Sequence, residues 1–110
     1  MQNSDIPEIT PSELKQKLDE DTSLFLLDVR EQDEYDLVHL NDAHLIPLNT
    51  LPYNIDDLPS DQEIVVYCHH GQRSLYATVF LHKKGFTEAK NLSGGIDQWA
   101  AEIDTTLRRY

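Results

Sequence analysis

The sequence predicts an α/β domain with a mainly parallel central sheet flanked by helices on both faces. Short apolar runs alternate with segments of helical periodicity along the 110 residues, which is the pattern of strands joined by crossover helices. The clearest strand signal, 64–67, is β-branched and aromatic throughout. The length fits one domain, and we expect it to span residues 1–110, with a core of about 7–104 and short flexible tails.

The first helix is expected to follow Thr10. Thr10 can cap it, Pro11 occupies a position where a missing N–H costs nothing, and Glu13 can reach back to the cap. Leu14 and Leu18, four residues apart, then supply its buried stripe. The next expected elements are a strand over 24–27 ending in Asp28, an acidic helix over 31–37, a short strand over 43–46, and a loop or single helical turn over 50–58.

In the second half, the strand 64–67 leads directly into a loop that contains the single cysteine, Cys68. A helix is expected over 75–84, and Gly85 suits the position just past its end. A last strand is expected over 89–92, after which Gly94-Gly95 turns the chain into a final helix. The helix 75–84 has apolar side chains at three-to-four spacing, namely Leu75, Tyr76, Val79 and Phe80.

Composition excludes several functional classes. The chain holds 20 Asp and Glu against 9 Lys and Arg, a formal charge of −11, which argues against non-specific nucleic-acid binding. One cysteine excludes an intramolecular disulfide framework and a cysteine-based structural zinc site. No apolar run approaches the roughly 20 residues of a membrane span. The N-terminus lacks the basic start and apolar stretch of a secretory signal, so we expect a cytoplasmic protein that binds neither nucleic acid nor membrane.

The cysteine lies where a parallel sheet places its functional groups, beyond the carboxyl end of a strand. At the mouth of the following helix, backbone N–H groups and the helix dipole favour negative charge on Cys68. Gly71 lets the loop curl, Arg73 adds a permanent cation, and Ser74 can cap the helix. The loop therefore has the means to stabilise a reactive thiolate.

Charge is distributed unevenly around this cysteine. The segment 66–90 holds four Lys or Arg and one acid, for a local charge of +3, whereas the rest of the chain holds five bases and nineteen acids, for −14. The cysteine thus lies in the only basic region of an acidic chain, which favours small anions nearby. The helix 31–37 is expected to present a solvated acidic face formed by Glu31, Asp33, Glu34 and Asp36.

The motifs resemble those of the rhodanese family of sulfurtransferases. The loop CHHGQRS at 68–74 resembles the family's active-site loop, Cys-x-x-Gly-x-Arg-Ser, and LLDVRE at 26–31 resembles its Asp-Val-Arg segment. HLNDAHLIPL at 39–48 resembles its His-Ile-x-Gly-Ala-x-Asn-Ile-Pro stretch, and NLSGGIDQW at 91–99 resembles its closing Gly-Gly and Trp. Ordered matches over about residues 10–100 predict a single rhodanese-like domain.

The chain departs from the family pattern at three positions. Val38 stands where a glycine often precedes the histidine, and Asp42 stands where a glycine is usual. His69 follows the cysteine where many relatives have arginine, which removes one fixed cation beside the sulfur.

The resemblance implies a sulfurtransferase that needs no metal or organic cofactor. The Cys68 thiolate would take sulfur from a small anionic donor such as thiosulfate, and cyanide, a small thiol or a protein cysteine would accept it. Metal binding by His69 and His70 is not expected, because adjacent side chains diverge. Asp28 and Arg30 are expected to pair and to fix nearby loops. The expected substrate-binding and persulfide-stabilising residues are His69, His70, Gly71, Gln72, Arg73 and Ser74.

Two other functions stay open at this point. A related fold serves oxyanions in cysteine phosphatases and arsenate reductases, whose loops place five residues between Cys and Arg. Only four separate Cys68 from Arg73, which favours a sulfur atom over a phosphoryl group. Alternatively, the chain is a rhodanese-like binding or redox-sensing module without turnover. Relatives of that kind commonly lack the cysteine, whereas this chain retains it.

Overall fold

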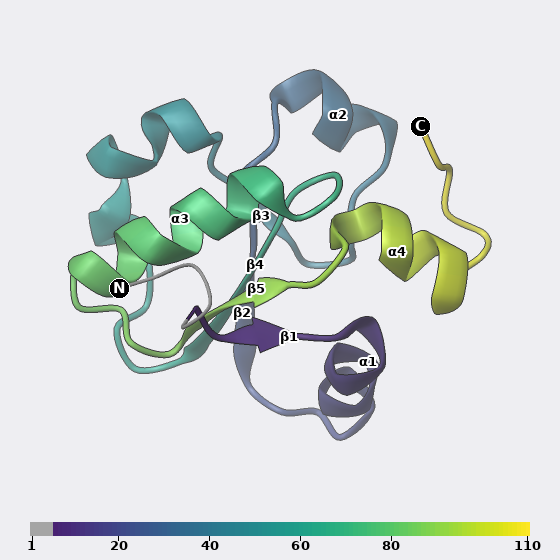
Figure 1. Cartoon of the computed structure of the whole chain (residues 1–110), viewed down its shortest axis with the longest axis horizontal. Helices are drawn as coiled ribbons and strands as arrows, with labels where there is room; N and C mark the ends of the chain where they lie inside the picture. Colours follow the sequence, from purple (N-terminus) through teal and green to yellow (C-terminus); the bar gives the residue numbers. More distant parts are fainter. Residues whose placement is uncertain (1–5) are drawn as a thin grey trace.

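The central sheet consists of five parallel strands in the order β1-β5-β4-β2-β3 (Figure 1). The structure is a computed structural model that describes residues 6–110. The strands are β1 (Glu8–Ile9), β2 (Leu24–Asp28), β3 (His44–Leu45), β4 (Glu63–Tyr67) and β5 (Ala89–Leu92). The predicted α/β class with a parallel sheet is therefore confirmed. Of the five strands, the sequence patterns did not predict the two-residue strand β1.

Helices cover both faces of this sheet (Figure 1). Side chains of α1 and α4 share one hydrophobic core, and side chains of α3 share the other with the first of two 3-10 helices. The helices are α1 (Pro11–Asp19), α2 (Gln32–Leu37), α3 (Gln72–Lys83) and α4 (Gly95–Glu102), and the 3-10 helices are Leu48–Tyr53 and Ile55–Asp57.

Strand β4 separates the two hydrophobic cores, and Cys68, which follows the strand, belongs to the core with α3. Ile64 and Val66 point into the core with α3, whereas Val65 and Tyr67 point into the core with α1 and α4. All four are buried, because the faces of a central parallel strand are both covered, and the strand therefore reads as an uninterrupted apolar run. Cys68 follows directly at its carboxyl end.

Two helices differ from their predicted faces. In α1 the capping box of Thr10 and Glu13 is present, as predicted, and Leu14 is buried, but Leu18 is 38% exposed. Helix α3 begins at Gln72 rather than at residue 75. It turns small side chains toward the sheet, so that the chain can approach β4 closely, while Tyr76 is 70% exposed. The residues of α3 that are buried are Ser74, Ala77, Thr78 and Leu81.

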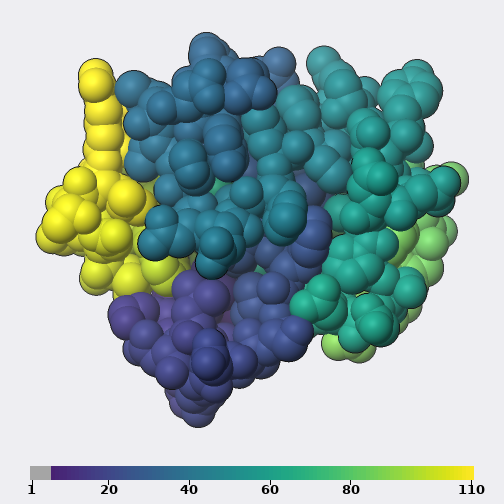
Figure 2. All heavy atoms as spheres, turned by 180° about the vertical axis from the view of Figure 1, so that it is seen from behind, coloured from purple at the N-terminus to yellow at the C-terminus, as the bar shows by residue number. Residues whose placement is uncertain are grey.

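The C-terminal segment 105–110 was expected to be a flexible tail, and the structure places it against the domain instead. Leu107 packs beside the core of α1 and α4, and the Tyr110 side chain contacts α2. Figure 2 shows this segment, in yellow, beside the blue residues that include α2. At the other end Ile6 is buried, and residues 1–5 of the expected N-terminal tail lie outside the described part. Within residues 6–110, no helix is both long and apolar enough to span a membrane.

Candidate active site

The sulfur of Cys68 lies within hydrogen-bond distance of three donor groups of its own loop. Its Sγ accepts from the backbone N–H of Gly71 at 3.1 Å and from that of Ser74 at 3.4 Å, and the Ser74 hydroxyl lies at 3.3 Å. Cys68 itself is 1% exposed. Successive backbone N–H groups that converge on one point bind and stabilise anions. The loop can therefore hold an anionic sulfur at the position of Cys68 Sγ.

The loop closes on Gly71, which is the N-cap of α3. Gly71 has a φ of 107°, a left-handed conformation that glycine adopts without the steric cost of a side chain. Ser74 was predicted to cap the helix and does not, because it already lies in the first turn of α3. Its hydroxyl instead lies between Cys68 Sγ and Asn91 Oδ1, at 2.5 Å from the latter.

Asn91 of β5 connects the sheet to this loop. Its Nδ2 donates to the carbonyl oxygen of Gly71 at 3.1 Å and to the Glu8 carboxylate at 3.0 Å, and its Oδ1 accepts from Ser74. The side chain is nearly fully buried. Sequence reasoning missed Asn91, although a polar amide inside a predicted buried strand is a usable signal, because such a group needs buried partners.

The Gly94-Gly95 turn holds the other side of the loop. The N–H of Ile96 donates to the carbonyl oxygen of Cys68 at 2.9 Å, and the N–H of Asp97 donates to that of His69 at 3.1 Å. Both N–H groups belong to the first turn of α4, where N–H groups have no partner within the helix and must find one outside it. A Cβ at Gly95 would collide with the carbonyl oxygens of Cys68 and His69. The glycine therefore permits this close approach.

Arg73 is bound by a carboxylate from α2. Its two terminal nitrogens donate to the two oxygens of Glu34 at 2.7 and 2.9 Å. This bidentate contact, with the hydroxyl of Tyr110 and an N–H of Glu31, lowers the pKa of Glu34 to about 2. Glu34 was expected on a solvated face, and its carboxylate is instead part-buried in this pair. The Arg73 charge is thereby neutralised locally.

The positive segment of the sequence does not form a positive site. Lys83 and Lys84 lie at the far end of the 12-residue helix α3, and Lys90 pairs with Glu63 at 2.8 Å. With Arg73 held by Glu34, no basic residue of the segment 66–90 presents a free cation at the sulfur. The expectation of basic surroundings for the cysteine is therefore wrong, because residues close in sequence are separated in space by the length of a helix.

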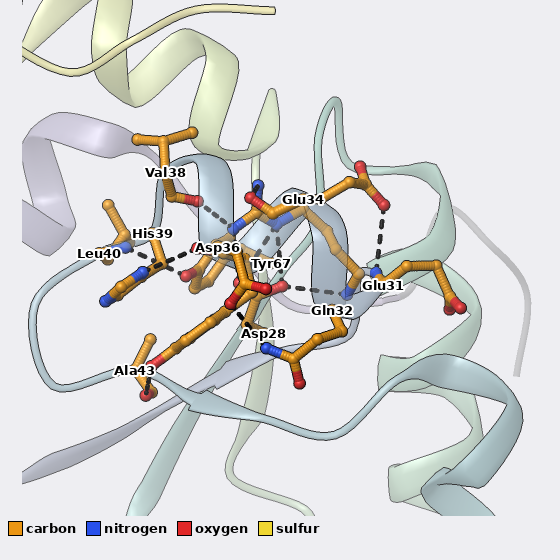
Figure 3. Close-up of polar contacts among 12 residues, drawn as sticks. Asp28, Glu31, Gln32, Glu34, Asp36, Val38, His39, Leu40, Ala43 and Tyr67 are labelled. Atoms are coloured by element: carbon orange, nitrogen blue, oxygen red, sulfur yellow. Dashed lines mark hydrogen bonds and ion pairs between the residues drawn. The ribbon is translucent and has the colours of Figure 1, made fainter.

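Asp28 and Arg30 form a buried pair at the carboxyl end of β2, as expected. The Arg30 guanidinium donates to the Asp28 carboxylate at 2.7 and 3.0 Å and to the carbonyl oxygen of Val38 at 2.6 Å. Its remaining terminal nitrogen donates to the Tyr110 hydroxyl at 2.9 Å. Figure 3 shows Asp28 and Val38, two members of this network, on either side of α2. Through the bond to Val38, which is the C-cap of α2, the pair connects the end of β2 to the end of α2, and it does not contact Cys68.

His69 is sandwiched between two rings at the rim of the loop. It stacks on Tyr110 with centroids 3.8 Å apart and planes 6° apart, and its ring lies 3.8 Å from that of His70. Burial and the neighbouring His70 lower the pKa of His69, so this ring is neutral at pH 7. His70 is exposed and lies 3.6 Å from the Asp97 carboxylate.

One group among residues 6–110 has ligand atoms close enough to suggest a metal. The donor atoms of His69, His70 and Asp97 lie within 4.8 Å of one another. Both oxygens of Asp97, however, accept hydrogen bonds from Arg109, at 2.9 and 3.1 Å. A cation already occupies the carboxylate, so this group is better described as an ion-pair network.

The sulfur opens to the surface through a small pocket of about 120 Å³. This volume accommodates a few heavy atoms rather than a drug-sized ligand. Larger cavities of about 350 and 360 Å³ lie near the end of α1 and do not reach the sulfur. The residues that line the small pocket are Cys68, His69, His70, Gln72 and Arg73.

Most of the chain matches one known protein family. The family model of the Rhodanese-like domain matches residues 10–102. The chain belongs to the rhodanese-like family. The solved rhodanese-like domain protein of Staphylococcus aureus superposes with a TM-score of 0.83 at 30% identity, over 96% of this chain and 99% of that one.

Several relatives of this rhodanese-like domain are named as sulfurtransferases. A sulfurtransferase of Allochromatium vinosum is 33% identical over 86% of this chain and 89% of its own length. A probable adenylyltransferase/sulfurtransferase of Mycobacterium tuberculosis, MoeZ, is 39% identical over 93% of this chain, but the chain spans only 26% of that protein. Relatives of the domain therefore include both a protein of similar size and a much longer one.

The rhodanese-like loop brings together every residue predicted for it. Cys68 through Ser74 surround the sulfur or line the pocket above it. Asp28 and Arg30 lie outside the pocket lining. The residues that sequence reasoning missed all come from other segments and contact the loop in space. They are Glu34, Asn91, Gly95 and Tyr110.

Proposed function

We propose that this rhodanese-like domain is a sulfurtransferase that carries sulfane sulfur as a persulfide on Cys68. The observation that carries the proposal is the ring of donors from Gly71 and Ser74 that converges on Sγ. Such donors stabilise an anionic sulfur, whether the thiolate or the terminal atom of a persulfide. The sulfurtransferase names of its relatives support the same chemistry.

The first half-reaction is a displacement at sulfur. The Cys68 thiolate attacks the outer sulfur of thiosulfate, the bond between the two donor sulfurs breaks, and sulfite leaves with its electron pair. The protein retains the anionic persulfide. Gln72 and the two histidines line the entrance to the sulfur, where they can contact the sulfonate oxygens of the donor.

The second half-reaction returns the thiolate. A thiophilic acceptor, cyanide or a thiolate, attacks the terminal persulfide sulfur, and the Cys68 sulfur leaves as the thiolate. With one cysteine in the chain, the persulfide has no internal thiol with which to form a disulfide. This favours a carrier that delivers its sulfur to an external acceptor, either a small molecule or a cysteine of another protein.

The pocket favours sulfur transfer over phosphate hydrolysis. A phosphatase loop must surround a tetrahedral phosphoryl group with donors and a free arginine. Here four residues separate Cys68 from Arg73, and the guanidinium is already bound to Glu34. An aryl-phosphate assay run beside the sulfur-transfer assay separates the two activities.

The test is intact-protein mass spectrometry after exposure to thiosulfate. We expect the wild-type mass to increase by one sulfur atom, and the addition of cyanide to remove it with formation of thiocyanate. Cys68→Ser should show no increase, because the hydroxyl cannot form a persulfide. A wild-type protein that stays unmodified over a wide range of donor concentrations, or that hydrolyses aryl phosphate without taking up sulfur, would contradict the proposal.

A further inference from the structure

The pocket above Cys68 has one fixed cation, and that cation is held by an acid. Among the pocket-lining residues, which all belong to the described part of the chain, only Arg73 carries a permanent positive charge. Its guanidinium donates to both oxygens of Glu34. A bidentate arginine–carboxylate pair is the strongest form of this contact, and its two charges cancel for any ligand that approaches the pocket.

Glu34 is held in this position from a second side. The hydroxyl of Tyr110 donates to Glu34 Oε2 at 2.8 Å, and that hydroxyl in turn accepts from the buried Arg30. The backbone N–H of Glu31 donates to the other oxygen at 3.1 Å. The carboxylate thus has fixed partners besides Arg73, and these partners keep it beside the loop.

Sulfur donors differ in charge while sharing the same reacting atom. Thiosulfate is a dianion, whereas alkyl thiosulfonates and deprotonated persulfides are monoanions. Each presents an outer sulfur to the thiolate. A unit charge at the pocket mouth changes the encounter free energy of a dianion by twice as much as that of a monoanion. The state of Arg73 therefore bears on which donor reacts fastest.

We infer that Glu34 sets the donor preference of the site: by neutralising Arg73 it disfavours dianionic thiosulfate relative to monoanionic sulfur donors. The inference rests on the proposed function, because it concerns the donor of that same half-reaction. Glu34 acts through Arg73 and does not touch the sulfur, so it is a positioning residue with an effect on specificity. The donor class that the site favours is then a small monoanion, such as a deprotonated low-molecular-weight persulfide.

The experiment compares two donors that load Cys68 by the same displacement. Thiosulfate releases sulfite, and the methanethiosulfonate anion releases methanesulfinate, each with the electron pair of the broken sulfur–sulfur bond. Second-order loading rate constants are measured for each donor by quenched intact mass spectrometry at about 0.1 M salt. The readout is their ratio, thiosulfate over methanethiosulfonate, which a change in general protein stability would not move.

Glu34→Gln should raise both rate constants unequally. For a freed unit charge about 6 Å away in water, we expect the loading rate constant to rise roughly tenfold for thiosulfate and roughly threefold for methanethiosulfonate. The ratio therefore rises about threefold. Arg73→Gln should lower the ratio by a similar factor, because Glu34 is then left as an uncompensated negative charge. The double variant Glu34→Gln/Arg73→Gln, which restores the wild-type net charge at the pocket, should return the ratio to its wild-type value.

Asp33→Asn is the matched control. Asp33 is an exposed acid of the same helix, so its loss removes the same formal charge without freeing Arg73, and the ratio should stay unchanged. The inference would be overturned, and the proposed function left intact, if Glu34→Gln, Asp33→Asn and wild type had the same ratio of rate constants. The same holds if Arg73→Gln slowed loading by both donors equally. Failure of both donors to load the wild-type protein would overturn the proposed function and the inference together.

Discussion

At the scale of single residues, backbone N–H groups donate the lasting hydrogen bonds to the sulfur of Cys68. The N–H groups of Gly71 and Ser74 are fixed by the loop and cannot turn away. The Ser74 hydroxyl has one hydrogen and two neighbours, the sulfur and the Asn91 amide oxygen. It can donate to the sulfur only by releasing Asn91, so the two N–H groups provide the permanent part of the anion site.

Glu34 also makes folding stability depend on pH. Its pKa falls from an ordinary value of 4.5 to about 2, chiefly because of its hydrogen bonds to Arg73. A lowered folded-state pKa gives stability that is fully present above the unfolded value and is lost as pH falls toward the folded one. Glu34 therefore contributes above about pH 4.5, and this contribution is lost between about pH 4.5 and 2.

Urea unfolding of wild type and Glu34→Gln at several pH values measures this contribution. Since the pair is partly exposed to solvent, we expect a difference of about 1 to 2 kcal/mol in the free energy of unfolding at pH 7. The difference should shrink steadily below pH 4.5 and be clearly smaller at pH 3 than at pH 7. A difference that stays constant over this range would show that the carboxylate charge is not the cause.

At the scale of elements, the cysteine loop is held between two helices that are remote in sequence. Helix α4 donates two N–H groups to the loop carbonyls through its Gly94-Gly95 start. Helix α2 holds Arg73 through Glu34. Strand β5 adds the amide of Asn91 beneath Gly71. The position of the sulfur therefore depends on three neighbouring elements besides the strand and helix that flank it.

Gly95→Ala tests the contribution of α4 to the loop. The added Cβ would meet the backbone oxygens of Cys68 and His69, which must move. We expect the free energy of unfolding to fall by about 2 to 4 kcal/mol, the sum of left-handed strain and overpacking. Sulfur loading of the folded fraction should slow by about tenfold or more, because each increase of about 1.4 kcal/mol in the activation free energy slows a reaction tenfold.

Gly85→Ala provides the control for this substitution. Gly85 also has a positive φ, of 96°, but nothing lies within 4 Å of the position of its added Cβ. Gly85→Ala should lower the free energy of unfolding by the backbone strain alone, about 1 to 2 kcal/mol, and should leave the rate of sulfur loading unchanged. Equal loading rates in the two variants, measured by mass spectrometry, would show that α4 does not position the loop.

The elements themselves were largely predictable from the sequence, and the contacts between them were not. The continuous apolar runs of β2 and β4 identified buried parallel strands, and the Thr10 capping box identified the start of α1. The pairing of Arg73 with Glu34 joins residues 39 positions apart. No periodicity reports such a contact, because it exists only once the sheet order has brought α2 beside the cysteine loop.

At the scale of the whole molecule, net charge opposes the entry of anionic donors. The chain carries a formal charge of −11, and the positive charge counted in the segment 66–90 is dispersed or paired rather than gathered at the sulfur. A dianion approaching this surface is repelled over a distance set by the ionic strength, about 30 Å at 0.01 M and about 10 Å at 0.1 M.

Loading by thiosulfate should therefore accelerate as salt is added. Between about 0.01 and 0.1 M sodium chloride we expect the second-order rate constant to rise by about two- to fivefold, since screening removes long-range repulsion. Methanethiosulfonate, with half the charge, should gain only about the square root of that factor. A steep monotonic fall for thiosulfate would instead mean that a local positive field, and not the acidic surface, governs the encounter with Cys68.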